Sequence, residues 1–228
     1  GDQNVAVGHE ALEANTTGTN NVAVGYEVLT ANTTGGSNTA LGLKALTANT
    51  TATNNVAIGS SAGVAVTTGS ENVVIGKDAG VALTTGTRNV VIGYEALKNE
   101  DAHSYNTAIG TQALFTQNAG ADAYNTAVGY QAGAAVTTGL RNTIIGGLAA
   151  DSVTEGNNNV ALGYNSLGAD TLGNNTVAIG QGTLQAQNFT SSTDAYNVAV
   201  GHQAGNSVTT GVQNTLIGGL AGDAITTA

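Results

Sequence analysis

Asn4-Val5-Ala6-Val7-Gly8 is the first copy of a pentapeptide that recurs along the whole chain of 228 residues. It reads Asn, then Val or Thr, then Ala or another aliphatic residue, then Val, Ile or Leu, then Gly, and the last copy is Asn214-Thr215-Leu216-Ile217-Gly218. The closing glycines are Gly8, Gly25, Gly42, Gly59, Gly76, Gly93, Gly110, Gly129, Gly146, Gly163, Gly180, Gly201 and Gly218. Ten of their twelve spacings are 17 residues, and the exceptions are 19 and 21. A fixed period of this length is typical of a solenoid, which predicts thirteen coils of about 17 residues.

Each coil contains two short segments separated by glycine turns. A Thr-Thr-Gly turn, first seen at Thr16-Thr17-Gly18, follows the closing glycine by eight to ten residues in six coils. The segment before the closing glycine is β-branched and apolar, which favours a strand. The second segment is Ala-rich, but a coil this short leaves a helix no room to pack back. We therefore expect two short strands per coil and a single all-β parallel β-solenoid domain over 1–228, a fragment of a longer fibre.

Strand alternation predicts which side chains of the pentapeptide share a face. The residue before the closing glycine is always Val, Ile or Leu, and the residue two positions earlier is always Val or Thr. Because alternate residues of a strand share a face, we expect these two to form the core. The residue between them is Ala in nine of thirteen copies. A small apolar outer face indicates contact with another subunit; an exposed Ala face is the alternative.

The second segment supplies one large aliphatic side chain per coil, from one of two sites. Leu stands four residues after the closing glycine in seven coils, and those coils have a polar residue at the seventh position, as in Leu29 and Asn32. The other six coils have Gly or Ala at the fourth position and Val, Leu or Ile at the seventh, as in Gly63 and Val66. Close packing explains the exchange, because both large residues would overfill a coil and neither would leave a void.

An Asn four residues before the closing glycine occurs in twelve of the thirteen copies, and in the remaining copy Asn175 is displaced by one position. Stacked coils would place these side chains in register, which predicts a structural amide ladder between coils. The ladder residues are Asn4, Asn21, Asn38, Asn55, Asn72, Asn89, Asn106, Asn125, Asn142, Asn159, Asn197 and Asn214.

Composition argues against several classes of partner and chemistry. The net charge is −10 and the five basic residues are scattered, so we expect no nucleic-acid partner. No apolar run approaches the roughly 18 residues of a membrane span. The chain has no Cys, and no phosphate loop, nucleophile elbow or metalloprotease motif, so we expect no enzyme, cofactor or metal site. His9 and His202 occupy a variable slot after the closing glycine, and with His103 they are interpreted as surface residues.

Two coils are longer than the rest, and their extra residues fall in 116–124 and 187–196. Insertions in solenoids map to loops, often on a binding face. Phe115, Tyr124, Phe189 and Tyr196 are therefore candidate contacts for a receptor or glycan. The alternative is that these loops are tolerated at the surface, with Tyr covering a coil edge.

Three stretches resemble known fibre proteins. Asn-Asn-Val-Ala-Ile-Gly at 54–59 and Asn-Thr-Val-Ala-Ile-Gly at 175–180 resemble the head repeats of YadA-like trimeric autotransporter adhesins. Asn-Thr-Ala-Val-Gly-Tyr-Gln-Ala-Gly at 125–133 is similar to repeats of phage tail fibres. The resemblance implies a left-handed β-roll, three chains packed around a common axis, and attachment to a host from a virion or a cell surface. The coiled-coil stalk, membrane anchor and self-cleaving chaperone domain of those families are absent here, and we expect flanking fibre domains.

The leading expectation is a structural and adhesive segment of a trimeric fibre, binding a host receptor or glycan. The alternative is an ice-binding solenoid, suggested by the Thr-rich turns, low charge and regular spacing. Adjacent threonines point to different sides, which argues against it. A polysaccharide depolymerase is a third class, but the carboxylates do not form the fixed pair that glycoside hydrolysis uses.

Overall fold

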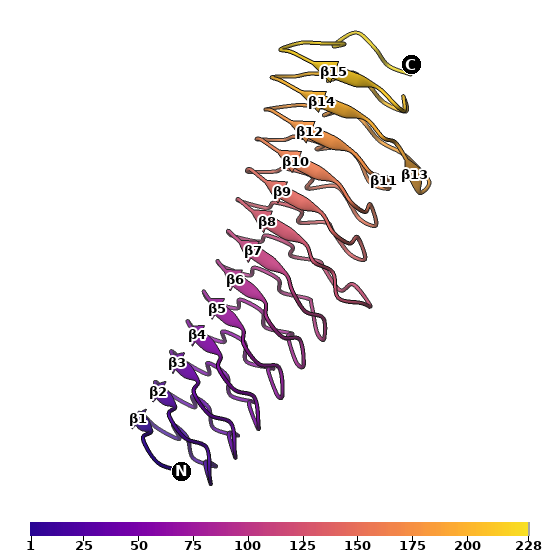
Figure 1. Cartoon of the computed structure of the whole chain (residues 1–228). Coiled ribbons are helices and arrows are strands. Elements are labelled where there is room, and N and C mark those ends of the chain that lie inside the picture. The colour runs from indigo at the N-terminus through magenta and orange to yellow at the C-terminus, as the bar shows by residue number, and fades with distance from the viewer. Residues whose placement is uncertain (228) are drawn as a thin grey trace. The chain divides into compact units, whose positions relative to one another are not determined.

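The computed structural model describes residues 1–227, which form two compact units, Gly1–Thr111 and Gln112 onward, called here the N-terminal and C-terminal units. Each unit is a stack of coils, and each coil contributes one three-residue strand (Figure 1). In the N-terminal unit the strands are β1 (Val5–Val7), β2 (Val22–Val24), β3 (Thr39–Leu41), β4 (Val56–Ile58), β5 (Val73–Ile75), β6 (Val90–Ile92) and β7 (Thr107–Ile109). In the C-terminal unit they are β8 (Thr126–Val128), β9 (Thr143–Ile145), β10 (Val160–Leu162), β12 (Val177–Ile179), β14 (Val198–Val200) and β15 (Thr215–Ile217).

Neighbouring strands within each unit pair in parallel, one coil apart. In the N-terminal unit Val56 pairs with Val73, Ala57 with Val74 and Ile58 with Ile75. Equivalent positions of the repeat therefore stack into columns. The structure confirms an all-β parallel β-solenoid of about thirteen coils and 17 residues per coil. Over residues 1–227 no helix is long and apolar enough to cross a membrane.

The Ala-rich second segment is not a strand, so the expectation of two strands per coil was wrong. Residues two and four positions after the closing glycine have positive φ, as at Glu27 (52°) and Leu29 (50°). An L-residue with positive φ lies outside the β region, so the segment forms turns. Its backbone still bonds from coil to coil, because the Leu29 N–H donates to the Ala45 carbonyl at 3.2 Å. A separate pair of two-residue strands, β11 (Gly173–Asn174) and β13 (Thr193–Asp194), joins the second insertion to the coil before it.

The closing glycine is required by the backbone. In all thirteen copies its φ lies between 127° and 141°, a range that side-chain-bearing residues rarely adopt. A Cβ on Gly59 would also lie 2.7 Å from the carbonyl carbon of Gly76 in the next coil. Conformation and close stacking therefore both explain why this position never varies.

The two faces of the strand are the reverse of the expectation. The central residue points into the coil: Ala57 and Val74 are fully buried. The first and third residues point outward: in β3 both Thr39 and Leu41 are exposed, whereas Ala40 between them is fully buried. Alternation was predicted correctly, but the larger side chains were assigned to the wrong face. The interior is narrow, and the Leu of the turn segment fills the space that a larger central residue would need.

The exchange between the fourth and seventh positions is confirmed. Leu29 in one kind of coil and Val66 in the other are both fully buried. A Cβ added to Gly63 would lie 3.3 Å from Val66 Cγ2 and 3.2 Å from Leu46 Cδ2. The fourth position after the closing glycine is therefore Gly or Ala in coils where the seventh residue already fills the interior.

A second rule, not predicted, links successive coils. Some coils have glycine at the fourth position after the closing glycine. When another strand follows such a coil, the central residue of that strand is large and lies eleven residues after this glycine. The pairs are Gly63 with Val74, Gly80 with Val91, Gly133 with Ile144 and Gly205 with Leu216, and the other nine strand centres are Ala. A Cβ on Gly133 would lie 2.8 Å from Ile144 Cδ1. Volume is therefore conserved between adjacent coils as well as within each coil.

Candidate functional site

The most extensive candidate site is the outward side of the main strands, called here the outer strand face and defined as the first and third residue of each strand. The first residue is Val or Thr and the third is Val, Ile or Leu in every strand, so the face carries no charge. Parallel register arranges these residues in two columns within each unit. Leu41, Ile145 and Leu162 expose 45%, 37% and 40% of their surface.

This exposed face is unlike the surface of most soluble monomers. Isolated exposed aliphatic residues are common, but a contiguous apolar patch marks an interaction site. The described residues contain no pocket, so the candidate site is a surface rather than a cavity.

The predicted ladder asparagines line a column in each unit, buried except for the half-buried Asn4 and Asn214. The Asn72 backbone N–H donates to Asn55 Oδ1 at 2.9 Å, and Asn72 Nδ2 donates to the Gly86 carbonyl at 2.9 Å. Asn72 Oδ1 in turn accepts from the Asn89 backbone N–H of the next coil at 2.9 Å, so each such side chain joins its own coil to the next one. Where the Asn is displaced, Thr176 takes the place and its backbone N–H donates to Asn159 Oδ1 at 2.9 Å.

Polar residues at the seventh position form a shorter interior column. Asn32 Nδ2 donates to Asn15 Oδ1 at 2.9 Å, and Asn49 Nδ2 donates to Asn32 Oδ1 at 2.8 Å. The next coil has Val66 at this position, which offers no donor. Asn49 Oδ1 is consequently the one buried side-chain polar atom of the described residues without a hydrogen-bond partner.

In the C-terminal unit, the buried carboxylate of Asp170 anchors the second insertion. Its Oδ1 accepts from the backbone N–H groups of Gly173 at 3.1 Å and Phe189 at 3.3 Å. Its Oδ2 accepts from Gln187 Nε2 at 2.7 Å. Burial raises the pKa of the Asp170 carboxyl, although these hydrogen bonds act in the opposite direction. These hydrogen bonds therefore hold the first residues of the second insertion against the coil interior.

The four aromatic residues proposed as receptor contacts have different surroundings. Tyr124 and Tyr196 expose 54% and 53% of their surface and stand at equivalent positions, each just before a column asparagine. Phe115 is half-buried. Phe189 exposes only 5% of its surface, so its buried ring is not available to a receptor. The sequence interpretation of Phe189 was therefore wrong, because an apolar ring in a longer coil covers the coil interior.

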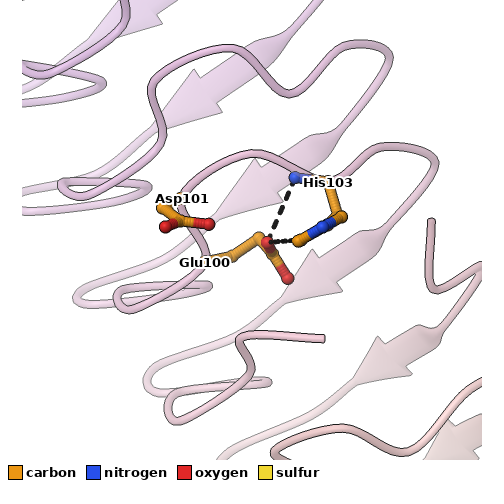
Figure 2. A group of neighbouring side chains, drawn as sticks. All are labelled: Glu100, Asp101 and His103. Carbon is orange, nitrogen blue, oxygen red and sulfur yellow. Dashed lines mark hydrogen bonds and ion pairs between the residues drawn. The ribbon is translucent and has the colours of Figure 1, made fainter. Parts of the chain in front are cut away.

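The three histidines also differ from one another. His9 is exposed and stacks on Tyr26, with ring centroids 5.1 Å apart, and His202 is exposed. His103 instead lies beside Glu100 and Asp101 in a single turn (Figure 2). Sequence reasoning missed this group. The available signal was the replacement of Thr-Thr-Gly by Asp101-Ala102-His103.

The chain was also compared with known proteins. No protein-family model, no curated protein and no solved structure matches it.

Proposed function

We propose that this chain is a structural and adhesive fibre segment whose copies associate through their outer strand faces into a homotrimer. The observation that carries the proposal is the uncharged double column of Val, Thr, Ile and Leu in each unit, whose residues are half-buried or exposed. Burying apolar surface contributes about 25 cal/mol per Å², so a repeated column is a strong association surface. The number three is taken from the resemblance to trimeric adhesin heads and tail fibres.

A second copy suits this face better than a partner of different composition. The columns repeat with the coil, so the same face on another chain presents side chains at the same spacing. Closed symmetric association of identical chains is the usual route to oligomers. It would also remove the exposed apolar surface from water while leaving the turns and insertions outside.

Attachment is proposed to occur through the insertions. Tyr124 and Tyr196 are exposed, and aromatic rings with a polar end are common anchors in binding interfaces. A receptor or glycan on a host surface is the partner that this role requires. The corresponding location is a virion tail fibre or a bacterial cell surface.

Light scattering of the purified chain tests the association. We expect a mass of about three times 22.3 kDa. The double variant Ile58→Lys/Ile75→Lys places two charges on the outer strand face and should yield a folded monomer. Thr68→Lys, at an exposed turn position, is the matched control and should remain a trimer. A wild-type monomer would contradict the proposal.

Ice binding is a second candidate, favoured by one structural feature. The outward side chains stand two residues apart on each strand and repeat on every neighbouring strand, which gives a regular array of about 6.6 by 4.8 Å. Such an array includes Thr39 and Thr107, which lie on the strands and not in the Thr-rich turns. A monomer with thermal hysteresis that Ile58→Lys/Ile75→Lys abolishes would support ice binding over assembly.

A further inference from the structure

One turn of the N-terminal unit differs from the repeat at four consecutive positions. The repeat has Asn32 followed by Thr33-Thr34-Gly35, whereas the coil closed by Gly93 has Glu100 followed by Asp101-Ala102-His103. Three of these four residues, Glu100, Asp101 and His103, carry metal-ligating groups. We propose that this turn binds one Zn²⁺ ion through one oxygen each of Glu100 and Asp101 and one imidazole nitrogen of His103.

The geometry brings the three side chains together. Their candidate ligand atoms all lie within 4.8 Å of one another, and among the described residues this is the only such group of three. Glu100 Oε1 accepts from His103 Nδ1 at 2.7 Å and from the His103 backbone N–H at 3.1 Å. Figure 2 shows the Glu100 carboxylate directed at the His103 ring, with Asp101 on its other side.

Burial of the Glu100 carboxylate favours a positively charged neighbour at this turn. Its side chain has no exposed surface, while the His103 side chain exposes 20%. A buried carboxylate is costly unless it is compensated by charge as well as by hydrogen bonds. His103 Nδ1 already lies 2.7 Å from Glu100 Oε1, and a divalent cation bound by both side chains would add positive charge at this carboxylate. The repeat serves as a control, because Asn32 occupies the equivalent site without a charge and donates to the Gly35 carbonyl at 3.0 Å.

Only small movements are needed to form the site. Zinc lies about 2.0–2.2 Å from nitrogen and carboxylate ligands, so its ligand atoms stand closer together than the 4.8 Å limit found here. Asp101 is exposed, and no hydrogen bond or ion pair of the described residues holds its carboxylate, so this side chain can close onto the ion. Coordination by the imidazole nitrogen requires its lone pair, so any proton on that nitrogen passes to solvent. Water completes the tetrahedral shell.

The donor set selects the class of metal. Imidazole with carboxylates suits zinc and its transition-metal neighbours, whereas calcium and magnesium prefer oxygen alone. The other histidines lack this environment. His9 lies 3.6 Å from Glu10, but both side chains are exposed.

Isothermal titration of the chelator-treated full chain with ZnCl2 tests the proposal. We expect one Zn²⁺ per chain, and we expect Asp101→Asn to weaken binding by about tenfold or more. The variant Glu100→Asn/Asp101→Thr/His103→Gly restores the repeat and should lose binding while keeping the wild-type circular dichroism spectrum. His202→Gln is the matched control and should bind like the wild type.

Three results would overturn the proposal. They are the absence of zinc binding by the wild type, full binding by both Asp101→Asn and the repeat-restoring variant, and a preference for CaCl2 over ZnCl2. The site does not depend on the proposed assembly. The outer-face variant Ile58→Lys/Ile75→Lys should still bind one Zn²⁺ per chain, so failure of one proposal is distinguishable from failure of the other.

Discussion

Adjacent residues of the same strand have opposite environments in this protein. In β4, Ala57 is fully buried, whereas Val56 and Ile58 on either side of it are only half-buried. The smaller side chain is inside and the larger ones are outside. In a globular domain the most apolar residues usually identify the core. In a thin solenoid the interior volume determines which side chains are buried. The larger apolar residues therefore lie on the outer strand face.

The comparison also explains the variable strand centres. Val74 and Ile144 are as buried as Ala57, yet each follows a coil with glycine at the fourth position. The interior accepts a large residue from the strand or from the preceding turn, but not from both. Packing density is therefore maintained by exchange between two coils.

The largest expected effect comes from a charge on the inner side of the strand. Ala57→Glu places an uncompensated carboxylate in the coil interior and should lower the free energy of unfolding by about 3–5 kcal/mol. Val56→Glu, one residue away on the outer strand face, should keep the folded circular dichroism spectrum and lose association. Urea denaturation and light scattering distinguish the two. Equal loss of folded structure in both variants would refute the assignment of the faces.

A cavity in the interior should have the next largest effect. Ile144→Ala should cost about 2–4 kcal/mol, because the glycine at position 133 leaves nothing to fill the space. Ile145→Ala, on the outer strand face, should cost about 1 kcal/mol or less in the isolated chain. Denaturant midpoints at matched concentration measure both. A larger loss for Ile145→Ala would mean that the outer face contributes more to stability than the interior packing rule does.

The interior polar column offers a smaller comparison between two equivalent residues. Asn32 bonds to coils on both sides, whereas Asn49 bonds on one side and has an unpaired Oδ1. Asn32→Ala should therefore cost about 1–3 kcal/mol, and Asn49→Ala should cost less. Thermal unfolding of the two variants provides the measurement. Identical costs would show that the bonds between coils contribute little.

The smallest expected effect is a pH dependence at Asp170. Burial raises its pKa above the ordinary value of 3.8, so the folded state binds a proton more readily than the unfolded state. The stabilisation from this proton is complete below 3.8 and is lost as the pH rises through the raised pKa. Wild-type stability should therefore fall relative to Asp170→Asn over this pH range. A difference that stays constant from pH 3 to pH 7 would contradict the role of burial.

Much of the fold could be predicted from the glycine spacing and the pentapeptide. The number of coils, the parallel stacking and the exchange between Leu29-type and Val66-type coils all followed from residue patterns. The turn conformation of the second segment did not, because Leu and Glu in the left-handed region leave no sequence signal. The grouping of Glu100, Asp101 and His103 was missed because His103 was interpreted alone, as a surface residue.

The sequence by itself determined the period, the strand positions and the columns, because a one-dimensional repeat can only stack on itself. Only the tertiary structure decided which strand face lies inside, which aromatic residues are exposed and which acidic residues meet a histidine. Alternation along a strand separates two faces but does not name the inner one. Which face lies inside depends on the volume that the turn segment of the coil leaves for the strand. Only the fold brings these two segments together.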